Sequence, residues 1–217
     1  MELIRPDWPL RVGAFATTAA MGDMATDPGR SRLRALVPNE PRWLHQVHGA
    51  EVIDADHTAT VVKADAAVAR QRGTVCAVKV ADCMPVLFAD EKGTVVAAAH
   101  AGWRGLAGGV LDATLDHMKT SPSKIMAWMG PAIGPRVYEV GDEVRAVFPG
   151  HEAAFQPNRP GHWLMDLYAI ARRQLERKGV THIYGGGFCT YTERDRFFSF
   201  RRDRGQSRMA AVIWLPT

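Results

Sequence analysis

Three segments of the sequence carry side chains that commonly bind transition metals. His45 and His48 lie in the segment LHQVHG, Cys83 ends the segment VADC, and His100 follows a run of small apolar residues. Zn²⁺ binds histidine nitrogen and cysteine thiolate, and three protein ligands that leave a fourth position open are typical of catalytic zinc sites. These segments lie far apart in the sequence, so the fold must bring them together. They indicate a candidate zinc site.

The same side chains are compatible with other chemistry. Cys83 can act as a nucleophile with His100 as its base, or the two can be a small buried thiol and a hydrogen-bonded core histidine. Asp82 can orient a histidine, transfer a proton or cap a turn. Arg104 can bind a phosphate or a carboxylate, and Cys189 lies in a glycine-rich loop that we expect to line the same pocket. Residue types alone leave these alternatives open.

A predicted β-hairpin brings two of these residues together. Its strands are the apolar runs on either side of the sequence DEKG, which suits a type I turn whose glycine takes a positive φ. Pairing Asp90 with Thr94 places His100 opposite Met84 and makes Cys83 its near neighbour at the open end of the hairpin. Strict alternation puts Cys83 and His100 on opposite faces, so we expect the cysteine to lie outside the regular pairing.

Strands and helices alternate along the chain. Apolar residues at helical spacing after Gly102 predict a helix whose glycine-rich start has free N–H groups that suit an anion. We expect a single α/β domain over residues 1–217, with mixed β-sheets sandwiched by helices in three layers. The other predicted strands are residues 12–17, 51–54, 64–69, 74–80, 125–129, 181–184 and 209–215, and the predicted helices are residues 32–36, 104–119, 140–148 and 167–178, the last capped by Asp166.

The composition favours a globular protein without a nucleic-acid or membrane partner. The chain has 217 residues, 47% of them hydrophobic, and a formal net charge of +4. Six arginines against two aspartates fall between Arg194 and Arg208, but aromatic and apolar residues interrupt them, so a small anionic ligand or surface ion pairs explain them equally well. No stretch approaches the roughly 18 apolar residues of a membrane span. Three cysteines without metal-finger spacing favour a reducing cytoplasm.

Several motifs together resemble the laccase-domain (YfiH-like) family. They are WLHQVHG, DAAVA, VADCMPVLFAD, AAAHAGWRGL, GPAIGP followed by YEVG, and the closing FFSFRRDRGQSRMAAVIWL, so the resemblance runs from about Pro41 to the C-terminus. Proteins of this family were first described as multicopper polyphenol oxidases and are now regarded as purine nucleoside phosphorylases. The resemblance implies a cytoplasmic, zinc-binding enzyme that cleaves adenosine, inosine, guanosine or methylthioadenosine with phosphate and also deaminates adenosine.

The resemblance also implies roles for individual residues. The metal ligands of the family match His48, Cys83 and His100. The residues expected to be catalytic are Asp82, Cys83 and Arg104. Those expected to bind the substrate are His45, Gln46, Arg104 and Cys189. Zinc is expected rather than copper, because oxidation by several coppers needs more histidines than this set offers. The expected partners are a purine nucleoside and phosphate, and the expected state is a monomer or weak homo-oligomer.

Three parts of the sequence depart from the family pattern. Residues 17–36 replace a longer N-terminal region that carries a Ser-Leu-Asn-Leu-Gly-like segment, Arg136 stands where a cysteine is common, and Gln206 and Ser207 replace a Thr-Gly pair before Arg208. These departures bear on substrate range and turnover. They keep three alternatives open: a cysteine hydrolase acting on a cell-wall precursor, a polyphenol oxidase, and a non-enzymatic protein that retains the metal and binds a ligand.

Overall fold

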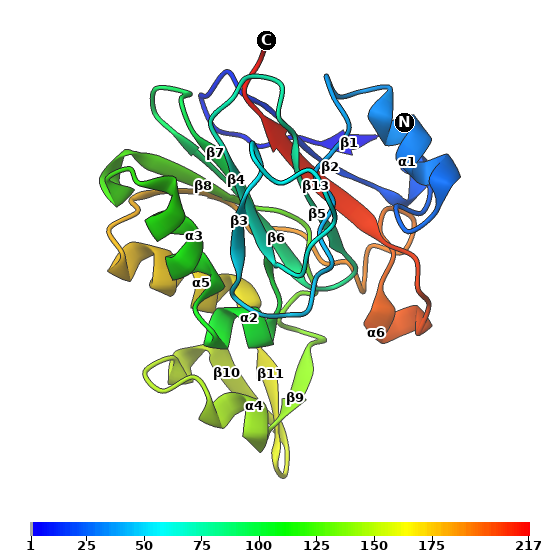
Figure 1. Ribbon diagram of the computed structural model, residues 1–217. Coiled ribbons are helices and arrows are strands. Elements are labelled where there is room, and N and C mark those ends of the chain that lie inside the picture. Colours follow the sequence, from blue (N-terminus) through cyan, green and yellow to red (C-terminus); the bar gives the residue numbers. More distant parts are fainter. Residues whose placement is uncertain (1) are drawn as a thin grey trace.

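The computed structural model describes residues 2–217, which fold into two large β-sheets, one small β-sheet and flanking helices (Figure 1). The strands are β1 (Leu3–Ile4), β2 (Gly13–Thr17), β3 (Val52–Asp54), β4 (Ala66–Ala69), β5 (Cys76–Val80), β6 (Met84–Asp90), β7 (Val96–Ala101), β8 (Ile125–Met129), β9 (Glu139–Gly141), β10 (Phe155–Arg159), β11 (His162–Met165), β12 (His182–Gly185) and β13 (Met209–Trp214). The helices are α1 (Asp27–Arg34), α2 (Trp103–Ala107), α3 (Val110–Met118), α4 (Asp142–Ala146), α5 (Leu167–Arg177) and α6 (Phe200–Asp203), with single 3₁₀ turns at Ala19–Met21, Pro122–Lys124 and Glu152–Ala154.

The two large sheets pack face to face at the centre of the molecule. The six-stranded sheet has the order β12-β8-β6-β7-β4-β3, and the four-stranded sheet has the order β1-β2-β13-β5. Helices α3 and α5 cover the outer face of the six-stranded sheet, and α1 covers the outer face of the other (Figure 1). The layers are therefore α3 with α5, the six-stranded sheet, the four-stranded sheet and α1. This makes four layers where three were expected, because two sheets rather than one lie between the helices.

Alternation along the central strands explains why a core forms on each side of the six-stranded sheet. In β7, Ala97 and Ala99 face the helices, while Val96 and Ala98 face the second sheet. Strands buried on both faces read as continuous apolar runs. The pairs β3–β4 and β12–β8 are parallel and the other pairs of this sheet are antiparallel. The predicted α/β class with a mixed sheet is therefore confirmed.

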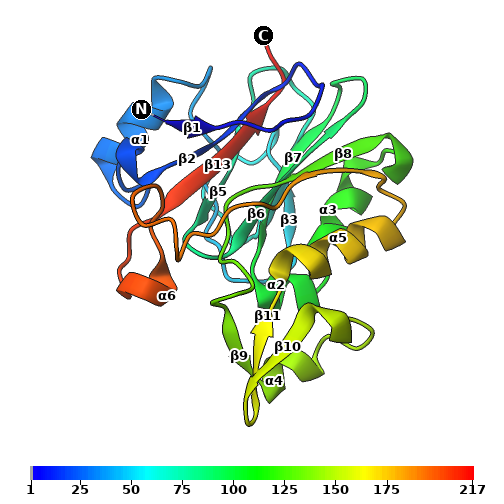
Figure 2. The same ribbon diagram turned by 180° about the vertical axis from the view of Figure 1, so that it is seen from behind.

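A small lobe that the sequence analysis did not anticipate projects from the sheets (Figure 2). It consists of the antiparallel sheet β10-β11-β9 with α4 beside it. The predicted helix over residues 140–148 is wrong at its start, because Val140 pairs with Trp163 in β11 and the helix begins only at Asp142. Strand β10 was missed because Phe155 is its only buried residue, so no apolar alternation marks it.

Two predicted helices have different outcomes. The predicted helix over residues 104–119 is in fact α2 and α3, which are separated by Gly109 in a left-handed conformation with φ of +82°. Helix α5 begins and ends as predicted, since the Asp166 side chain caps its first turn and Gly179, with φ of +92°, follows its last residues. Among residues 2–217, no helix combines the length and the apolar character needed to cross a membrane.

The hairpin β6–β7 differs by one residue from the predicted register. Pro85, rather than Met84, lies opposite His100. Because side chains alternate along a strand, Cys83 then shares a face with Pro85 and His100. This face points into the layer between the two large sheets, where Leu87 of the same face is buried. The predicted conflict between the directions of Cys83 and His100 therefore does not arise.

The side chain of Asp90 sets this register. The turn itself forms as predicted, with Gly93 at φ of +64° and its N–H donating to the Asp90 carbonyl at 3.0 Å. The Asp90 carboxylate also accepts the N–H of Thr94 at 2.6 Å and the N–H of Val95 at 3.0 Å. Thr94 therefore stays in the loop, and the backbone N–H of Asp90 donates to the carbonyl of Val95 at 3.1 Å.

Asp90→Asn is expected to destabilise the protein at neutral pH. Burial alone would raise the pKa of Asp90, but hydrogen bonds from Val95 and Thr94 hold it below its usual value. The carboxylate therefore stabilises the fold above the unfolded pKa of about 3.9 and loses this effect as the pH falls through the folded pKa. Loss of the acceptor should cost about 1–3 kcal/mol in urea denaturation at neutral pH. The exposed Asp195→Asn is the matched control, and equal stability of the two variants would contradict this role.

Candidate functional site

Three side chains from separate segments converge at the open end of the hairpin. The ligand atoms of His48, Cys83 and His100 lie within 4.8 Å of one another. The two imidazole rings are 4.8 Å apart between centroids and meet edge to face. His48 lies in the loop before β3, Cys83 immediately precedes β6, and His100 lies within β7. We call these three residues the triad.

Gly102 gives the triad the space it needs. A Cβ atom at this position would lie 2.7 Å from the Cys83 Sγ and 3.5 Å from the His48 Cδ2. Real Cβ atoms essentially never approach another heavy atom this closely. The residue after β7 must therefore be a glycine for the thiol to lie between the two histidines, in addition to its place at the start of α2.

A buried carboxylate that the sequence analysis overlooked orients two of the ligands. Asp65 is fully buried and accepts the N–H groups of Val47, His48 and Gly49 at 3.1, 2.9 and 2.7 Å. These bonds hold His48 in a left-handed conformation, φ of +61°, that is uncommon for a residue other than glycine. Asp65 also contacts the Nδ1 of His100 at 2.8 Å, which leaves the Nε2 for a metal. The only signal in the sequence was an aspartate directly before the apolar strand AAVA.

Charge interactions within the triad favour the thiolate of Cys83. Burial alone would raise the pKa of this thiol, but His100 and His48 lower the pKa to about 6. Burial acts to lower the pKa of His100, yet Cys83 and Asp65 raise this pKa to about 9. A thiolate and two imidazoles, one of them backed by a carboxylate, form a donor set that zinc prefers. The triad therefore fits a single metal ion held by three protein ligands.

The triad lies in the wall of a cavity of about 780 Å³, a size within the roughly 300–1,000 Å³ of small-molecule sites. The cavity is rich in cations, and Asp82 contributes the one carboxylate among its lining residues. The arginine-rich segment near the C-terminus supplies three of the cations, which supports the predicted small anionic ligand. The cationic lining residues are Lys79, Arg104, Arg201, Arg204 and Arg208.

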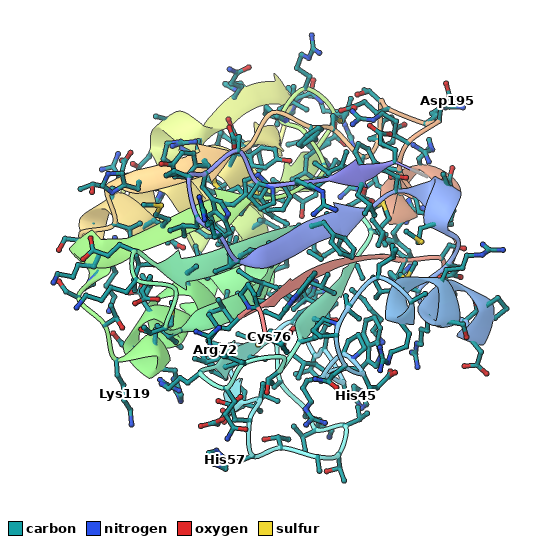
Figure 3. The ribbon with its side chains drawn as sticks, turned by 90° about the horizontal axis from the view of Figure 1, so that it is seen from above. His45, His57, Arg72, Cys76, Lys119 and Asp195 are labelled. Carbon is teal, nitrogen blue, oxygen red and sulfur yellow. The ribbon has the colours of Figure 1, made fainter. Side chains whose placement is uncertain are left out.

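Three of the residues predicted to bind the substrate, His45, Gln46 and Arg104, line the cavity. His45, whose side chain is labelled in Figure 3, is one of these lining residues. Arg104 follows the triad in the chain, and its guanidinium lies over the ring of Trp103, 4.4 Å from the centroid. This stacking leaves the guanidinium edge available for a ligand beside the triad.

Gln46 and Cys189, which are also predicted to bind the substrate, have hydrogen-bond partners within the protein. The Gln46 side chain lines the cavity, but its amide accepts the backbone N–H of Lys79 at 2.8 Å and donates to the carbonyl of Lys79 at 2.7 Å. It thus extends the hydrogen bonding at the edge of β5. The Cys189 thiol accepts the N–H of Gly134 in the GPAIGP loop at 3.3 Å. Cys189 is not among the residues that line the cavity, so its contact with a substrate stays a prediction.

Asp82 anchors the arginine-rich segment to the triad. Its backbone is left-handed, with φ of +84°. Its buried carboxylate accepts hydrogen bonds from Thr190 Oγ1 at 2.6 Å, from Ser199 Oγ at 3.0 Å and from the N–H of Arg201 at 2.6 Å. These donors engage both carboxylate oxygens and hold Arg201 over the ring of Tyr138. The sequence analysis did not identify Tyr138 or Arg201 individually, because both enter the site through this tertiary contact.

Comparisons with known proteins bear on the whole chain. The family model described as multi-copper polyphenol oxidoreductase laccase matches residues 22–216. A purine nucleoside phosphorylase of Pseudomonas aeruginosa is 43% identical, with 98% of both chains covered. Purine nucleoside phosphorylase YfiH of Escherichia coli is also 43% identical, with 99% of both chains covered. The similarity therefore begins well before Pro41, where the motifs had placed its start, and includes most of the segment 17–36.

Solved structures give the same result. A Neisseria meningitidis protein is 40% identical and superposes with a TM-score of 0.93, with 100% of both chains covered. YlmD from Geobacillus stearothermophilus is 32% identical and superposes with a TM-score of 0.86, covering 100% of this chain and 97% of that one. Given the match over residues 22–216 and relatives 43% identical along almost the whole sequence, this chain belongs to the multi-copper polyphenol oxidoreductase laccase family.

Proposed function

We propose that this protein is a zinc-dependent purine nucleoside phosphorylase of the cytoplasm. The observation that carries the proposal is the convergence of His48, Cys83 and His100 in the wall of a cavity rich in arginine. Relatives that are 43% identical over almost the full length carry the name purine nucleoside phosphorylase. Phosphorolysis needs a site for an uncharged nucleoside and an anion together, and this cavity combines aromatic and cationic side chains.

The donor set favours zinc over a multi-copper centre. Oxidation of phenols by several coppers requires several groups of histidine ligands. Among residues 2–217, the triad is the one group of three or more histidine, cysteine or carboxylate side chains close enough to share an ion. Two imidazoles and a thiolate suit a single zinc ion. The polyphenol oxidase alternative is therefore the weaker one for this chain, despite the description of its family.

Arg104 is the residue best placed to bind the attacking phosphate. Zinc held by the triad would supply Lewis-acid polarisation of an oxygen of phosphate or water. The Arg104 guanidinium lies over the ring of Trp103, and its planar fork of N–H donors matches phosphate oxygens. It would neutralise phosphate charge as an oxygen attacks the ribose C1′ and the purine leaves with the electrons of the glycosidic bond. Asp82 supports this site by positioning Arg201, in addition to its expected role as a proton carrier.

Adenosine deamination is the proposed second reaction. In it a water molecule activated by the metal would attack C6 of the purine ring, and the amino group would leave as ammonia. Adenosine, inosine, guanosine and methylthioadenosine are the proposed phosphorolysis substrates. The remaining alternatives differ in their products. A cysteine hydrolase would require Cys83 free of metal, and a ligand-binding protein would retain the metal without turnover.

Product analysis of adenosine incubated with and without phosphate tests the proposed function. Adenine that forms only with phosphate is expected, and inosine formed without phosphate would report deamination. Arg104→Met should lower kcat/KM for phosphate roughly 10–100-fold, because it removes charge-assisted hydrogen bonds worth about 1.5–3 kcal/mol. Arg194→Met, an exposed change in the arginine-rich segment, is the matched control. Bound zinc without any adenine would support the binding protein instead.

Elemental analysis tests the metal site. The purified protein should contain about one equivalent of zinc, and Cys83→Ala should lose both zinc and activity. Asp65→Asn should weaken zinc binding by about 10–100-fold, because the carboxylate orients a metal-binding histidine. The exposed Asp195→Asn should bind zinc as the wild type does. Less than about half an equivalent in the wild type, or full zinc in Cys83→Ala, would refute the ligand assignment.

Alkylation of the chelator-treated protein tests the charge state of Cys83. Because His100 and His48 lower the pKa of Cys83 to about 6, its thiolate should form, and iodoacetamide should react, as the pH rises through that value. Cys76 should stay unreactive in the same sample, because burial raises its pKa far above neutrality. Peptide mass spectrometry separates the two sites. A midpoint of Cys83 alkylation near the ordinary thiol pKa of about 8.5 would contradict this account.

A further inference from the structure

The cavity extends from the triad to a second group of charges. Lys79 of β5 and Arg208, the residue before β13, both line it. We call these two residues the cationic pair. The ring of Phe200 forms the neighbouring wall, and the guanidinium of Arg208 lies 5.8 Å from its centroid. The mechanism proposed above assigns no task to this end of the cavity.

The strand register places the cationic pair on one face of the four-stranded sheet. Lys79 lies opposite Ala210 in the antiparallel pair β5–β13. Arg208 precedes Ala210 by two positions, so it lies on the same face and diagonal to Lys79. Diagonal neighbours of this kind are roughly 7–8 Å apart, within reach of long side chains. Ala81, which follows β5, also lines the cavity, as do Asp82 and Cys83, so the cavity extends along this segment from Lys79 to the triad.

Among residues 2–217, no carboxylate forms an ion pair with the side chain of Lys79 or Arg208, although the Asp23 carboxylate accepts the backbone N–H of Arg208 at 2.8 Å. Lys79 is half-buried, and burial together with the charges of Arg30 and Arg208 lowers its pKa. Arg208 is held in place by hydrogen bonds from Nη1 to the carbonyls of Gly205 and Ser207 at 3.2 and 2.9 Å. Two partly buried like charges kept together without a counter-ion are stabilised by a bound anion.

The cationic pair is distinct from the residue proposed to hold the attacking phosphate. Arg104 lies on α2, directly after β7 of the six-stranded sheet, whereas Lys79 lies on β5 of the four-stranded sheet. A nucleoside whose glycosidic bond lies at the triad therefore has the cationic pair on one side and Arg104 beside the reacting carbon. An anionic substituent on the ribose, away from C1′, is the group that this separation suits.

We propose that Lys79 and Arg208 form a second anion subsite, which binds the phosphoryl group of a purine nucleoside monophosphate. The inference rests on the proposed nucleoside site and extends its ligands from nucleosides to nucleotides. The phosphoryl group carries the negative charge that the cationic pair lacks, and the Arg208 guanidinium and the Lys79 ammonium supply charge-assisted hydrogen bonds. The free nucleoside leaves both cations unpaired.

Calorimetric titration of the purified protein with adenosine and with adenosine 5′-monophosphate tests the second subsite. The monophosphate should bind at least about tenfold more tightly than adenosine, as expected for hydrogen bonds to charged groups. Lys79→Met and Arg208→Met should each remove most of this preference, and Arg208→Lys should retain part of it because the charge remains. Lys92→Met, on the hairpin loop, is the control that should leave the preference intact. The readout is the ratio of the two affinities, so a variant that binds both ligands less tightly still gives an answer.

Three outcomes would overturn the inference. The first is equal affinity of the wild type for the two ligands, and the second is an undiminished preference in both methionine variants. The third is a raised KM for inorganic phosphate with adenosine in Lys79→Met, which would assign the cationic pair to the attacking phosphate.

Failure of the proposed function gives a different pattern, namely tight binding of the monophosphate without phosphorolysis of adenosine. Phosphorolysis of adenosine without a preference for the monophosphate would sink only the second subsite.

Discussion

The contact between the Asp65 carboxylate and the His100 imidazole is the interaction on which the candidate site depends. Burial opposes ionisation of Asp65, but hydrogen bonds from His100, Gly49 and Val47 hold its pKa below the usual value. A buried charge is stable only with such partners. The same carboxylate therefore fixes the loop that carries His48 and the strand that carries His100. His48 and His100, which are distant in the sequence, are held by the same carboxylate. Their relative position therefore does not depend on the rigidity of the His48 loop alone.

Asp82 positions the cavity wall by hydrogen bonds, as Asp65 positions His48 and His100. It lies next to Cys83 and binds three groups of the C-terminal part of the chain. The fold thus uses two neighbouring buried aspartates for two separate tasks. One orients the triad, and the other brings the arginine-rich segment over it. Asp82 is the one carboxylate among the lining residues and already accepts three hydrogen bonds within the protein, so the charged groups left for a ligand are mainly cations.

Much of the fold and the grouping of the triad were predictable from the sequence, and the failures have physical causes. Apolar runs and caps marked most strands and α5, while residue types combined with the family resemblance identified His48, Cys83 and His100 as a set. The predicted hairpin register was wrong by one residue. It paired the backbones of Asp90 and Thr94, but the N–H of Thr94 instead donates to the Asp90 carboxylate. Asp65 was missed because its partners come from other segments. The small lobe was missed because its outer strand is polar.

The strand order of the four-stranded sheet has a consequence for biosynthesis. β13 is the last strand of the chain, yet it lies between β2 and β5. A ribosome makes the chain from its N-terminus, so the neighbours of this strand emerge long before it does. The proposed metal ligands end at His100, whereas Arg201 and Arg208 of the cavity wall arrive only just before β13. The ribosome therefore makes all three proposed ligands well before the C-terminal wall of the cavity, which would separate metal binding from substrate binding in time.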